Sequence, residues 1–520
     1  MPRLQRNLVH LMSGTLVARL LGFLREMVCA NAFGASRGMD LFVIAMTVPS
    51  FFRRVLGEDV VERAFMPPFK SLLTRGKHAE AWRLLATCLN VMTILSLVVL
   101  ACLYLLAPLL VRAIAPGLEA ELIPQAVRMT WIVLPFMLFI GLAAFAGGVL
   151  NIFECNRVYA LSPAMLSGAV ITSVLLFQDS IGIYCLPAGA VAGAFLQLLV
   201  QLPAIYRTLR KHPEARYRAS LDLRSPQTRA VGRESKFILL KSLVDKSVEV
   251  ADRVLASWLL AGSISALWFA QRLVQLPLAV FALAISRAFT PYLTEKQAEA
   301  DHERFVTGIR QGMLLNIYIL APVAAGSIVM GDLLVALVYE RGAFNADNTR
   351  LTALAFSAYA LGLPAIGIQA LLSRVFAVLQ ANRTVFHISV GTATLNIVLN
   401  IILVKTSLAH AGLALASSIS FMVNAFLLIT LLNKAMPGAI SMGRAIRDLL
   451  GGCGLAIGPA LLTVALRQSE IALLTPQTGF WPRFVALAIL GVIFVASYLL
   501  IARFFGPSEL RNRLPGGKPK

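Results

Sequence analysis

Residues 8–34 read LVHLMSGTLVARLLGFLREMVCANAFG. This apolar run is long enough to cross a lipid bilayer as a helix, because a span needs about 20 apolar residues. It nevertheless contains three charged residues, Arg19, Arg25 and Glu26. An arginine at the centre of a bilayer costs roughly 2.5–3.5 kcal/mol on insertion scales, and charges kept inside spans usually serve a function. The stretch therefore predicts a membrane helix whose arginines bind something.

The composition of the whole chain also favours a membrane protein. Of its 520 residues, 58% are hydrophobic and 14% are charged, and the mean hydropathy is +0.76. Soluble domains have about 45–50% apolar and about 25% charged residues. Continuous apolar runs recur along the chain, whereas a β-barrel would show short alternating segments. We predict an all-α integral membrane protein.

We expect about 14 transmembrane helices from the apolar runs. Basic residues gather in alternate connections, so the positive-inside rule places both termini in the cytoplasm and requires an even number of spans. The same topology accounts for the formal net charge of +21, and no nucleic-acid partner is expected. The expected spans are residues 8–34, 39–56, 84–113, 127–152, 159–178, 181–206, 236–260, 264–293, 308–339, 348–379, 384–405, 409–433, 446–467 and 482–504.

An internal repeat divides the chain into two halves. AFMP at 64–67 matches AFTP at 288–291, and LLV at 109–111 matches LLV at 333–335, each 224 residues later. Six spans in each copy make the repeat parallel. Two halves related by an axis along the membrane normal are typical of transporters that bind substrate between them.

The repeat and a basic polar segment predict five parts. These are an N-terminal lobe of six helices, a basic cytoplasmic linker, a C-terminal lobe of six helices, two C-terminal helices outside the repeat, and a cytoplasmic tail. Their expected limits are 1–209, 210–235, 236–434, 435–505 and 506–520. The linker either binds anionic lipid head groups or only fixes the topology.

Four arginines within spans outnumber the acids close to them, and they come from both halves of the repeat. A planar guanidinium binds phosphate oxygens two at a time. A water-filled cavity between the halves, lined by these arginines, would therefore suit a phosphate group. The alternative is that they reach the interfaces or pair with distant acids. The four are Arg19, Arg25, Arg53 and Arg272.

Several neighbouring charges would offset part of this positive charge. Arg54 and Glu58 have the i,i+4 spacing that pairs side chains on a helix. Glu26 lies in the first span, and Asp40 opens the second. We predict that these residues act as charge partners or gating residues.

The seventh expected span, KSLVDKSVEVADRVLASWLL at 241–260, carries six charges that sum to zero. The i,i+4 spacing predicts a Glu249–Arg253 pair, and Asp252 is a minor candidate ligand for a coupling cation. The cysteines and histidines show no metal-ligand spacing, and no G-x-x-x-x-G-K-[ST] loop for ATP occurs. We expect no metal, cofactor or catalytic residue. A Na+ or H+ gradient, the membrane potential or the substrate gradient would then drive movement.

Residues 18–58 read ARLLGFLREMVCANAFGASRGMDLFVIAMTVPSFFRRVLGE and are followed by AFMP, while residues 262–293 read GSISALWFAQRLVQLPLAVFALAISRAFTPYL. Both stretches resemble the MurJ (MviN) lipid II flippases of the multidrug/oligosaccharidyl-lipid/polysaccharide (MOP) exporter superfamily. The resemblance implies a transporter of the bacterial cytoplasmic (inner) membrane. It would move lipid II, the undecaprenyl-pyrophosphate-linked peptidoglycan precursor, to the outer leaflet by alternating access.

The resemblance also implies roles for particular residues. The family's essential cavity arginines match the four arginines named above, and its acidic gating partners match Asp40 and Glu58. Spans 13 and 14 would form a groove for the lipid tail. The stretch EDVVER at 58–63 departs from the small or hydroxyl residues that are usual in the family after Glu58.

Other functions stay open on the sequence. A flippase for another undecaprenyl-linked glycan, such as an O-antigen unit, would need the same arginines. A MATE-like cation or drug antiporter would need an acidic cavity, and an enzyme acting on isoprenoid phosphates would need a nucleophile or metal ligands. A structural membrane scaffold would have no use for the arginines. We therefore predict a lipid II flippase rather than an enzyme.

Overall fold

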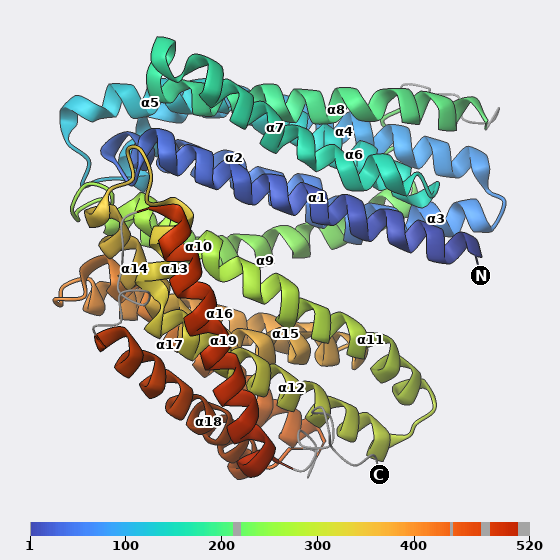
Figure 1. Cartoon of the computed structure of the whole chain (residues 1–520). Helices are drawn as coiled ribbons and strands as arrows, with labels where there is room; N and C mark the ends of the chain where they lie inside the picture. The colour runs from blue at the N-terminus through green and yellow to red at the C-terminus, as the bar shows by residue number, and fades with distance from the viewer. Residues whose placement is uncertain (1, 212–219, 437–439, 470–478, 508–520) are drawn as a thin grey trace. The chain divides into compact units, whose positions relative to one another are not determined.

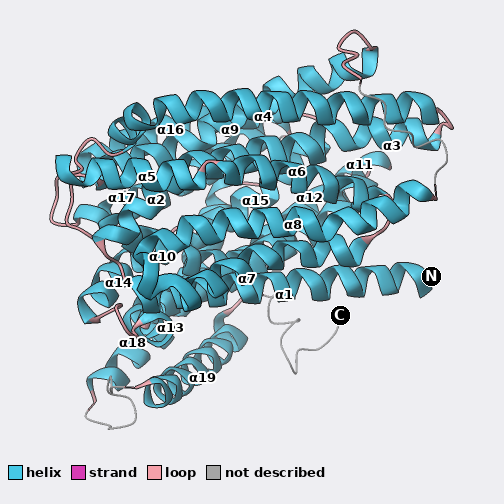
Figure 2. Ribbon diagram, turned by 90° about the horizontal axis from the view of Figure 1, so that it is seen from above, coloured by secondary structure: helices cyan, strands magenta, loops and turns pink. Residues whose placement is uncertain are grey.

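The computed structural model describes residues 2–211, 220–436, 440–469 and 479–507. Within these ranges it describes all side chains except those of residues 2–13, 15, 54, 56–58, 156 and 382. Every regular element in this part of the chain is a helix, and none is a strand (Figure 2). The predicted all-α fold is therefore confirmed, and each expected span overlaps one helix or consecutive helices.

The chain forms two compact units, Met1–Gly262 and Ser263–Lys520 (Figure 1). The lobe limits expected from the repeat stay predictions. The first unit contains α1 (Pro2–Phe33), α2 (Arg37–Phe52), η1 (Arg53–Phe65), α3 (Met66–Thr74), α4 (His78–Ile114), η2 (Ala120–Leu122), α5 (Ile123–Val133), α6 (Pro135–Ile152), α7 (Asn156–Ile181), η3 (Gly182–Tyr184), α8 (Cys185–Arg210) and α9 (Pro226–Ala256).

In the first unit, α7 packs against both α1 and α8, and α6 packs against α8 and η1. Aromatic side chains fix η1 in this bundle. The Phe65 ring lies 4.7 Å from the Phe145 ring of α6 and 5.2 Å from the Phe69 ring of α3, measured between centroids. Val61 and Phe65 of η1 are each 1% exposed, so this segment is anchored in an apolar core.

The second unit is a separate helical bundle. Its core includes Ile317, Leu371 and Leu428, and the hydroxyl of Tyr498 donates to the carbonyl of Tyr318 at 2.7 Å. The last two helices therefore pack on α12. The elements are α10 (Ser263–Pro277), η4 (Leu278–Ala282), α11 (Leu283–Ala298), α12 (His302–Val329), α13 (Gly331–Tyr339), α14 (Ala346–Ala360), α15 (Leu363–Val378), α16 (Asn382–Leu403), α17 (Ala409–Ala435), α18 (Met442–Gln468) and α19 (Phe480–Phe505).

Both units contain a π-helical segment, in which backbone hydrogen bonds run from residue i to i+5. Such segments are usually single turns and often occur at functional sites. Here η1 is 13 residues long. The offset of 224 residues that relates the repeat motifs also relates η4 to residues 54–58, which lie inside η1. The two copies therefore have π-helical backbone at matched positions.

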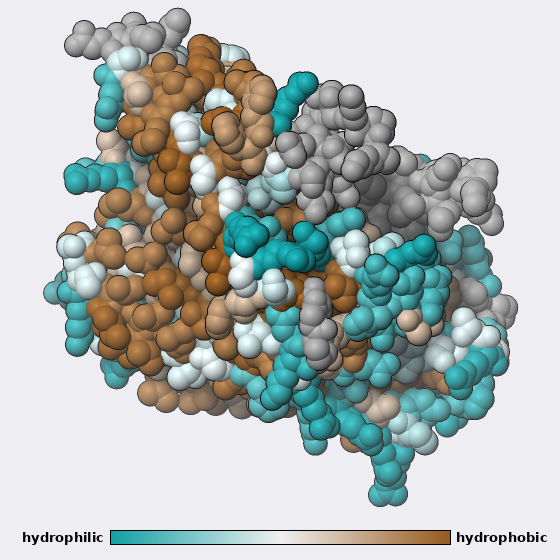
Figure 3. All heavy atoms as spheres, turned by 90° about the horizontal axis from the view of Figure 1, so that it is seen from below, coloured by the Kyte–Doolittle hydropathy of each residue, from teal (hydrophilic) through white to brown (hydrophobic). Residues whose placement is uncertain are grey.

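The surface of both bundles is strongly apolar. Leu105, Leu175 and Val492 are more than three-fifths exposed, and Figure 3 shows broad apolar areas on one face of the molecule. Nine segments of the described chain are long and apolar enough to cross a membrane, or ten if the bent pair α14–α15 is one span. Soluble proteins rarely expose apolar patches of this extent, so this surface contacts lipid. The number of fourteen crossings stays a prediction.

A glycine in α6 permits the close packing of η1, which yields a test. An added Cβ at Gly148 would lie 2.7 Å from Cγ1 of Val61, whereas one at Gly141 of the same helix would meet open space. We expect Gly148→Ala to push η1 away and to reduce the free energy of unfolding by about 1–3 kcal/mol. Gly141→Ala should leave it unchanged or raise it, because alanine is the better helix former. Apparent thermal midpoints in detergent compare the two variants, and equal midpoints would contradict this packing.

Candidate functional site

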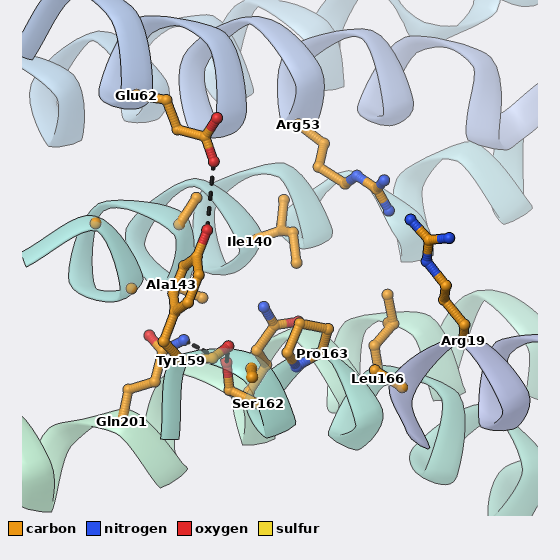
Figure 4. A pocket seen from close by; sticks show the side chains of 16 residues that line it. Arg19, Arg53, Glu62, Ile140, Ala143, Tyr159, Ser162, Pro163, Leu166 and Gln201 are labelled. Carbon is orange, nitrogen blue, oxygen red and sulfur yellow. Dashed lines mark hydrogen bonds between the residues drawn. The ribbon is translucent and has the colours of Figure 1, made fainter. Parts of the chain in front are cut away.

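Helices of the first unit line an open cavity of about 410 Å³. Its walls come from α1, η1, α6, α7 and α8, and Ile140 and Leu166 belong to the apolar part of the lining (Figure 4). Arg19 of α1 and Arg53 of η1 enter it from two sides. Their guanidinium groups point toward one another (Figure 4). The structure thus brings two of the four predicted arginines to one cavity.

The charge of this cavity favours an anion. Two guanidinium groups, those of Arg19 and Arg53, face each other, while Glu62 supplies one carboxylate. Two guanidinium groups that point toward one another can together bind one anion. Phosphate oxygens fit the planar guanidinium forks in pairs.

The end of the cavity away from Arg19 is lined by uncharged polar groups and by Glu62 (Figure 4). The hydroxyl of Tyr159 donates to Oε1 of Glu62 at 3.4 Å. The side-chain amide of Gln201 donates to the hydroxyl of Ser162 at 2.7 Å. The cavity therefore has a cationic end and an end rich in hydrogen-bonding groups.

The π-helical geometry of η1 explains how Arg53 and Glu62 reach the same cavity. These residues are nine positions apart, so an α-helix with 3.6 residues per turn would place them about 180° apart, on opposite faces. With i to i+5 bonding a helix has about 4.4 residues per turn, which brings the same two positions within about 20°. The bond from the Met66 amide to the Val61 carbonyl shows this spacing. Sequence reasoning missed Glu62 because it assumed the α-helical period.

Arg25 has a different environment from the two cavity arginines. It forms an ion pair with its neighbour Glu26 at 2.5 Å, and the two side chains are 22% and 6% exposed. Adjacent residues on a helix do not normally face each other, so helical spacing did not predict this pair. Glu26 therefore neutralises Arg25 within α1.

Asp40, one of the predicted charge partners, lies in the first turn of α2. It is buried, and its Oδ2 accepts a hydrogen bond from the backbone amide of Gly262 at 2.7 Å. The carboxylate therefore joins the start of α2 to the end of the first unit. The predicted partners Arg54 and Glu58 lie outside the residues whose side chains are described.

The seventh expected span corresponds to α9, where Asp252 and Arg253 are both buried. In this helix Lys246 forms an ion pair with Glu249, three residues later. The sequence had predicted Arg253 as the partner of Glu249. The role of Asp252 as a cation ligand stays a prediction. In the part of the chain that the structure describes, no group of three or more His, Cys, Asp or Glu side chains is arranged to hold a metal ion.

Arg272 belongs to the second unit. Its guanidinium lies over the Trp268 ring, 4.0 Å from the centroid, and donates to Oε1 of Gln275 at 3.3 Å. The ring face attracts the cation. Its place in a cavity shared with the arginines of the first unit stays a prediction.

Comparison with known proteins identifies the family. A family model described as "Lipid II flippase MurJ" matches residues 29–475. The chain belongs to this family. The Lipid II flippase MurJ of Burkholderia cenocepacia is 28% identical over 434 residues, which cover 82% of this chain and 84% of that protein. Membership in a flippase family confirms the prediction of a transporter, and with the apolar helices it indicates a multi-pass bacterial membrane protein.

Solved structures show the same fold. A "Lipid II flippase MurJ, inward closed conformation" has a TM-score of 0.80 at 23% identity and covers 96% of this chain and 98% of its own. The inward-facing conformation of a multidrug resistance MATE family transporter of the MOP superfamily has a TM-score of 0.69 at 13% identity. This match covers 83% of this chain and 98% of that transporter. The predicted superfamily fold is therefore confirmed.

The ion pair of Arg25 with Glu26 can be tested by removing one or both partners. Glu26→Leu leaves the mostly buried Arg25 guanidinium without its carboxylate, which should cost about 3 kcal/mol of unfolding free energy. The double variant Arg25→Leu/Glu26→Leu removes both charges and should recover most of that loss. Apparent thermal midpoints in detergent measure the difference. A single variant as stable as the double one would show that the pair is not formed.

Proposed function

We propose that this protein moves lipid II, a lipid-linked oligosaccharide with an undecaprenyl pyrophosphate anchor, from the inner to the outer leaflet of the cytoplasmic membrane. Family membership supports the substrate. The observation that carries the mechanism is the convergence of Arg19 and Arg53 on one cavity of the first unit. In this proposal the two arginines bind the pyrophosphate, and Arg25 and Arg272 complete the site.

The chemistry of the substrate explains why arginines belong in this place. A pyrophosphate with attached sugars cannot cross a hydrocarbon layer without replacements for the water that solvates it. Guanidinium groups supply charge and several N–H donors in a fixed geometry. The isoprenoid tail is apolar and can stay in the bilayer. We propose that spans 13 and 14, within residues 435–505, form a groove that holds this tail.

Release requires the arginines to lose affinity for the pyrophosphate in the outward-facing state. A transporter changes its conformational equilibrium only through a difference in affinity between states. We propose that Asp40, Glu58, Glu26 and Arg54 provide that difference by exchanging partners with the cavity arginines as the two six-helix lobes rock. Asp252 would bind a coupling cation if a Na+ or H+ gradient rather than the membrane potential drives the cycle.

The proposed orientation places both termini and the basic linker 210–235 in the cytoplasm. Membrane lipids surround the bundle, and the cavity opens alternately to each side. No covalent step is involved, so the protein needs no catalytic residue or cofactor in this cycle.

The function can be tested in a peptidoglycan-making bacterium whose own lipid II flippase is depleted. Depletion should arrest wall synthesis and cause lipid II to accumulate, and the wild-type chain should restore growth. Arg19→Ala, Arg53→Ala and Arg272→Ala should each fail to restore growth at equal protein level, because each removes a charge from the anion site.

The matched control is Arg112→Ala, which removes an exposed arginine of α4 outside the cavity. It should restore growth as the wild type does. Restoration by all three cavity variants, with lipid II at its normal level, would refute the proposed mechanism.

A further inference from the structure

A second open pocket, of about 580 Å³, lies at one end of the second unit. It is formed by α13, by one face of α14, by the ends of α12 and α18, and by the start of α19. Apolar and charged side chains both contribute to it. Among the residues that the structure describes, the charged lining consists of three arginines and two acids, namely Arg350, Arg467, Arg483, Asp332 and Glu340.

Both acids of this pocket are paired with arginines that line it as well. Arg467 forms an ion pair with Asp332 at 2.5 Å, and Arg483 forms one with Glu340 at 2.6 Å. The second carboxylate oxygen of Glu340 accepts a hydrogen bond from the hydroxyl of Thr349 at 2.6 Å. The two carboxylates are therefore neutralised within the pocket wall, which makes the pocket a poor site for a cation.

The third arginine, Arg350, gives the pocket an excess positive charge. It is exposed on α14 and forms no ion pair with any other residue that the structure describes. The described lining therefore carries one more positive than negative charge. A ligand with a single negative charge would balance it, and the guanidinium group of Arg350 can bind phosphate oxygens in pairs.

The pocket lies at the depth of the lipid head groups. Arg467 is one residue from the end of α18 and Arg483 lies in the first turn of α19, and both helices are long and apolar enough to cross a membrane. Trp481, in the same turn of α19, is 71% exposed. Tryptophans are enriched at the interface between membrane and water. In the orientation proposed above, this end of the second unit faces the outer leaflet.

The apolar part of the lining extends the site toward the bilayer. Ile328 and Leu354 line the pocket and are 39% and 52% exposed. Leu354 follows Arg350 by four residues, so it lies on the same face of α14 and about 6 Å further from this end of the helix. Acyl chains would contact these apolar side chains, whereas a soluble anion would gain nothing from them.

We propose that this pocket binds a phospholipid with one net negative charge, of the phosphatidylglycerol type. Arg350 contacts the phosphate, while Ile328 and Leu354 contact the acyl chains. The single charge of this head group matches the single excess charge of the lining, whereas a zwitterionic phospholipid has no net charge to balance it. A pocket of about 580 Å³ is in the usual range for small-molecule sites.

The bound lipid has a structural consequence for the second unit. It lies against α14 and also against the ends of α18 and α19, so it joins the two C-terminal helices to the rest of the bundle. This inference goes beyond the proposed function, because it concerns a lipid that stays with the protein and is not transported.

The lipid can be identified by photo-capture on the full-length protein in nanodiscs that contain equal amounts of phosphatidylglycerol, phosphatidylethanolamine and phosphatidylcholine. A diazirine analogue of leucine replaces Leu354, and mass spectrometry counts the captured lipids. Phosphatidylglycerol should exceed each of the other two about fivefold, the effect of one arginine near a membrane surface. The same analogue in place of Leu461, an exposed residue of α18 outside the pocket, should capture the three lipids equally.

Charge variants show whether Arg350 causes the preference. Arg350→Gln should lower the ratio at position 354 to about one, whereas Arg350→Lys keeps the charge and should keep most of the preference. Arg444→Gln removes an exposed arginine near the other end of α18 and should leave the ratio unchanged. Equal thermal midpoints of the wild type and Arg350→Gln in phosphatidylcholine nanodiscs would show that the substitution leaves the fold intact.

Several results would overturn this assignment. Equal capture of the three lipids at position 354, or a preference that Arg350→Gln leaves intact, would show that the pocket does not select an anionic head group through this arginine. Capture of phosphatidylethanolamine at the level of phosphatidylglycerol would refute the match of net charge. Soluble glycerol phosphate should not reduce the capture, because it lacks acyl chains, and a reduction would show a site for soluble anions instead.

Discussion

The convergence of the Arg19 and Arg53 guanidinium groups on one cavity of the first unit is the interaction on which this account depends. Each planar guanidinium group presents N–H donors in a fixed fork that matches phosphate oxygens in pairs. The fold must therefore orient two side chains from separate helices toward one point. An anion that binds there contacts both groups at once, which suits the site to a pyrophosphate.

The surrounding structure shows how the two groups are kept in place. Phe65 packs on Phe145, and the absence of a side chain at Gly148 lets η1 approach α6 closely. The π-helical period then turns Arg53 and Glu62 toward one cavity. Arg25 differs from the two cavity arginines in the structure, because it forms an ion pair with Glu26 of the same helix. The four arginines predicted from charge alone thus occupy at least two kinds of environment.

Much of the fold and part of the site could be predicted from the sequence. Long apolar runs predicted an all-helical membrane protein. The charges inside those runs predicted four site arginines, and two of them, Arg19 and Arg53, line one cavity. Three features depended on geometry that the sequence does not display. The π-helix placed Glu62 in the cavity, Arg25 paired with an adjacent residue, and Tyr159 and Gln201 come from two different helices to line the same cavity. Whether Arg272 joins the same site depends on how the two units meet, which local sequence does not determine.

Position-specific photo-crosslinking tests the central claim most directly. A diazirine analogue of leucine in place of Leu166, which lines the cavity, should capture lipid II, and Arg19→Ala should abolish the capture. The same analogue in place of Leu175, an exposed residue of the same helix outside the cavity, should capture only bulk lipid. Equal capture of lipid II from both positions, or capture at Leu166 that persists without Arg19, would contradict the account.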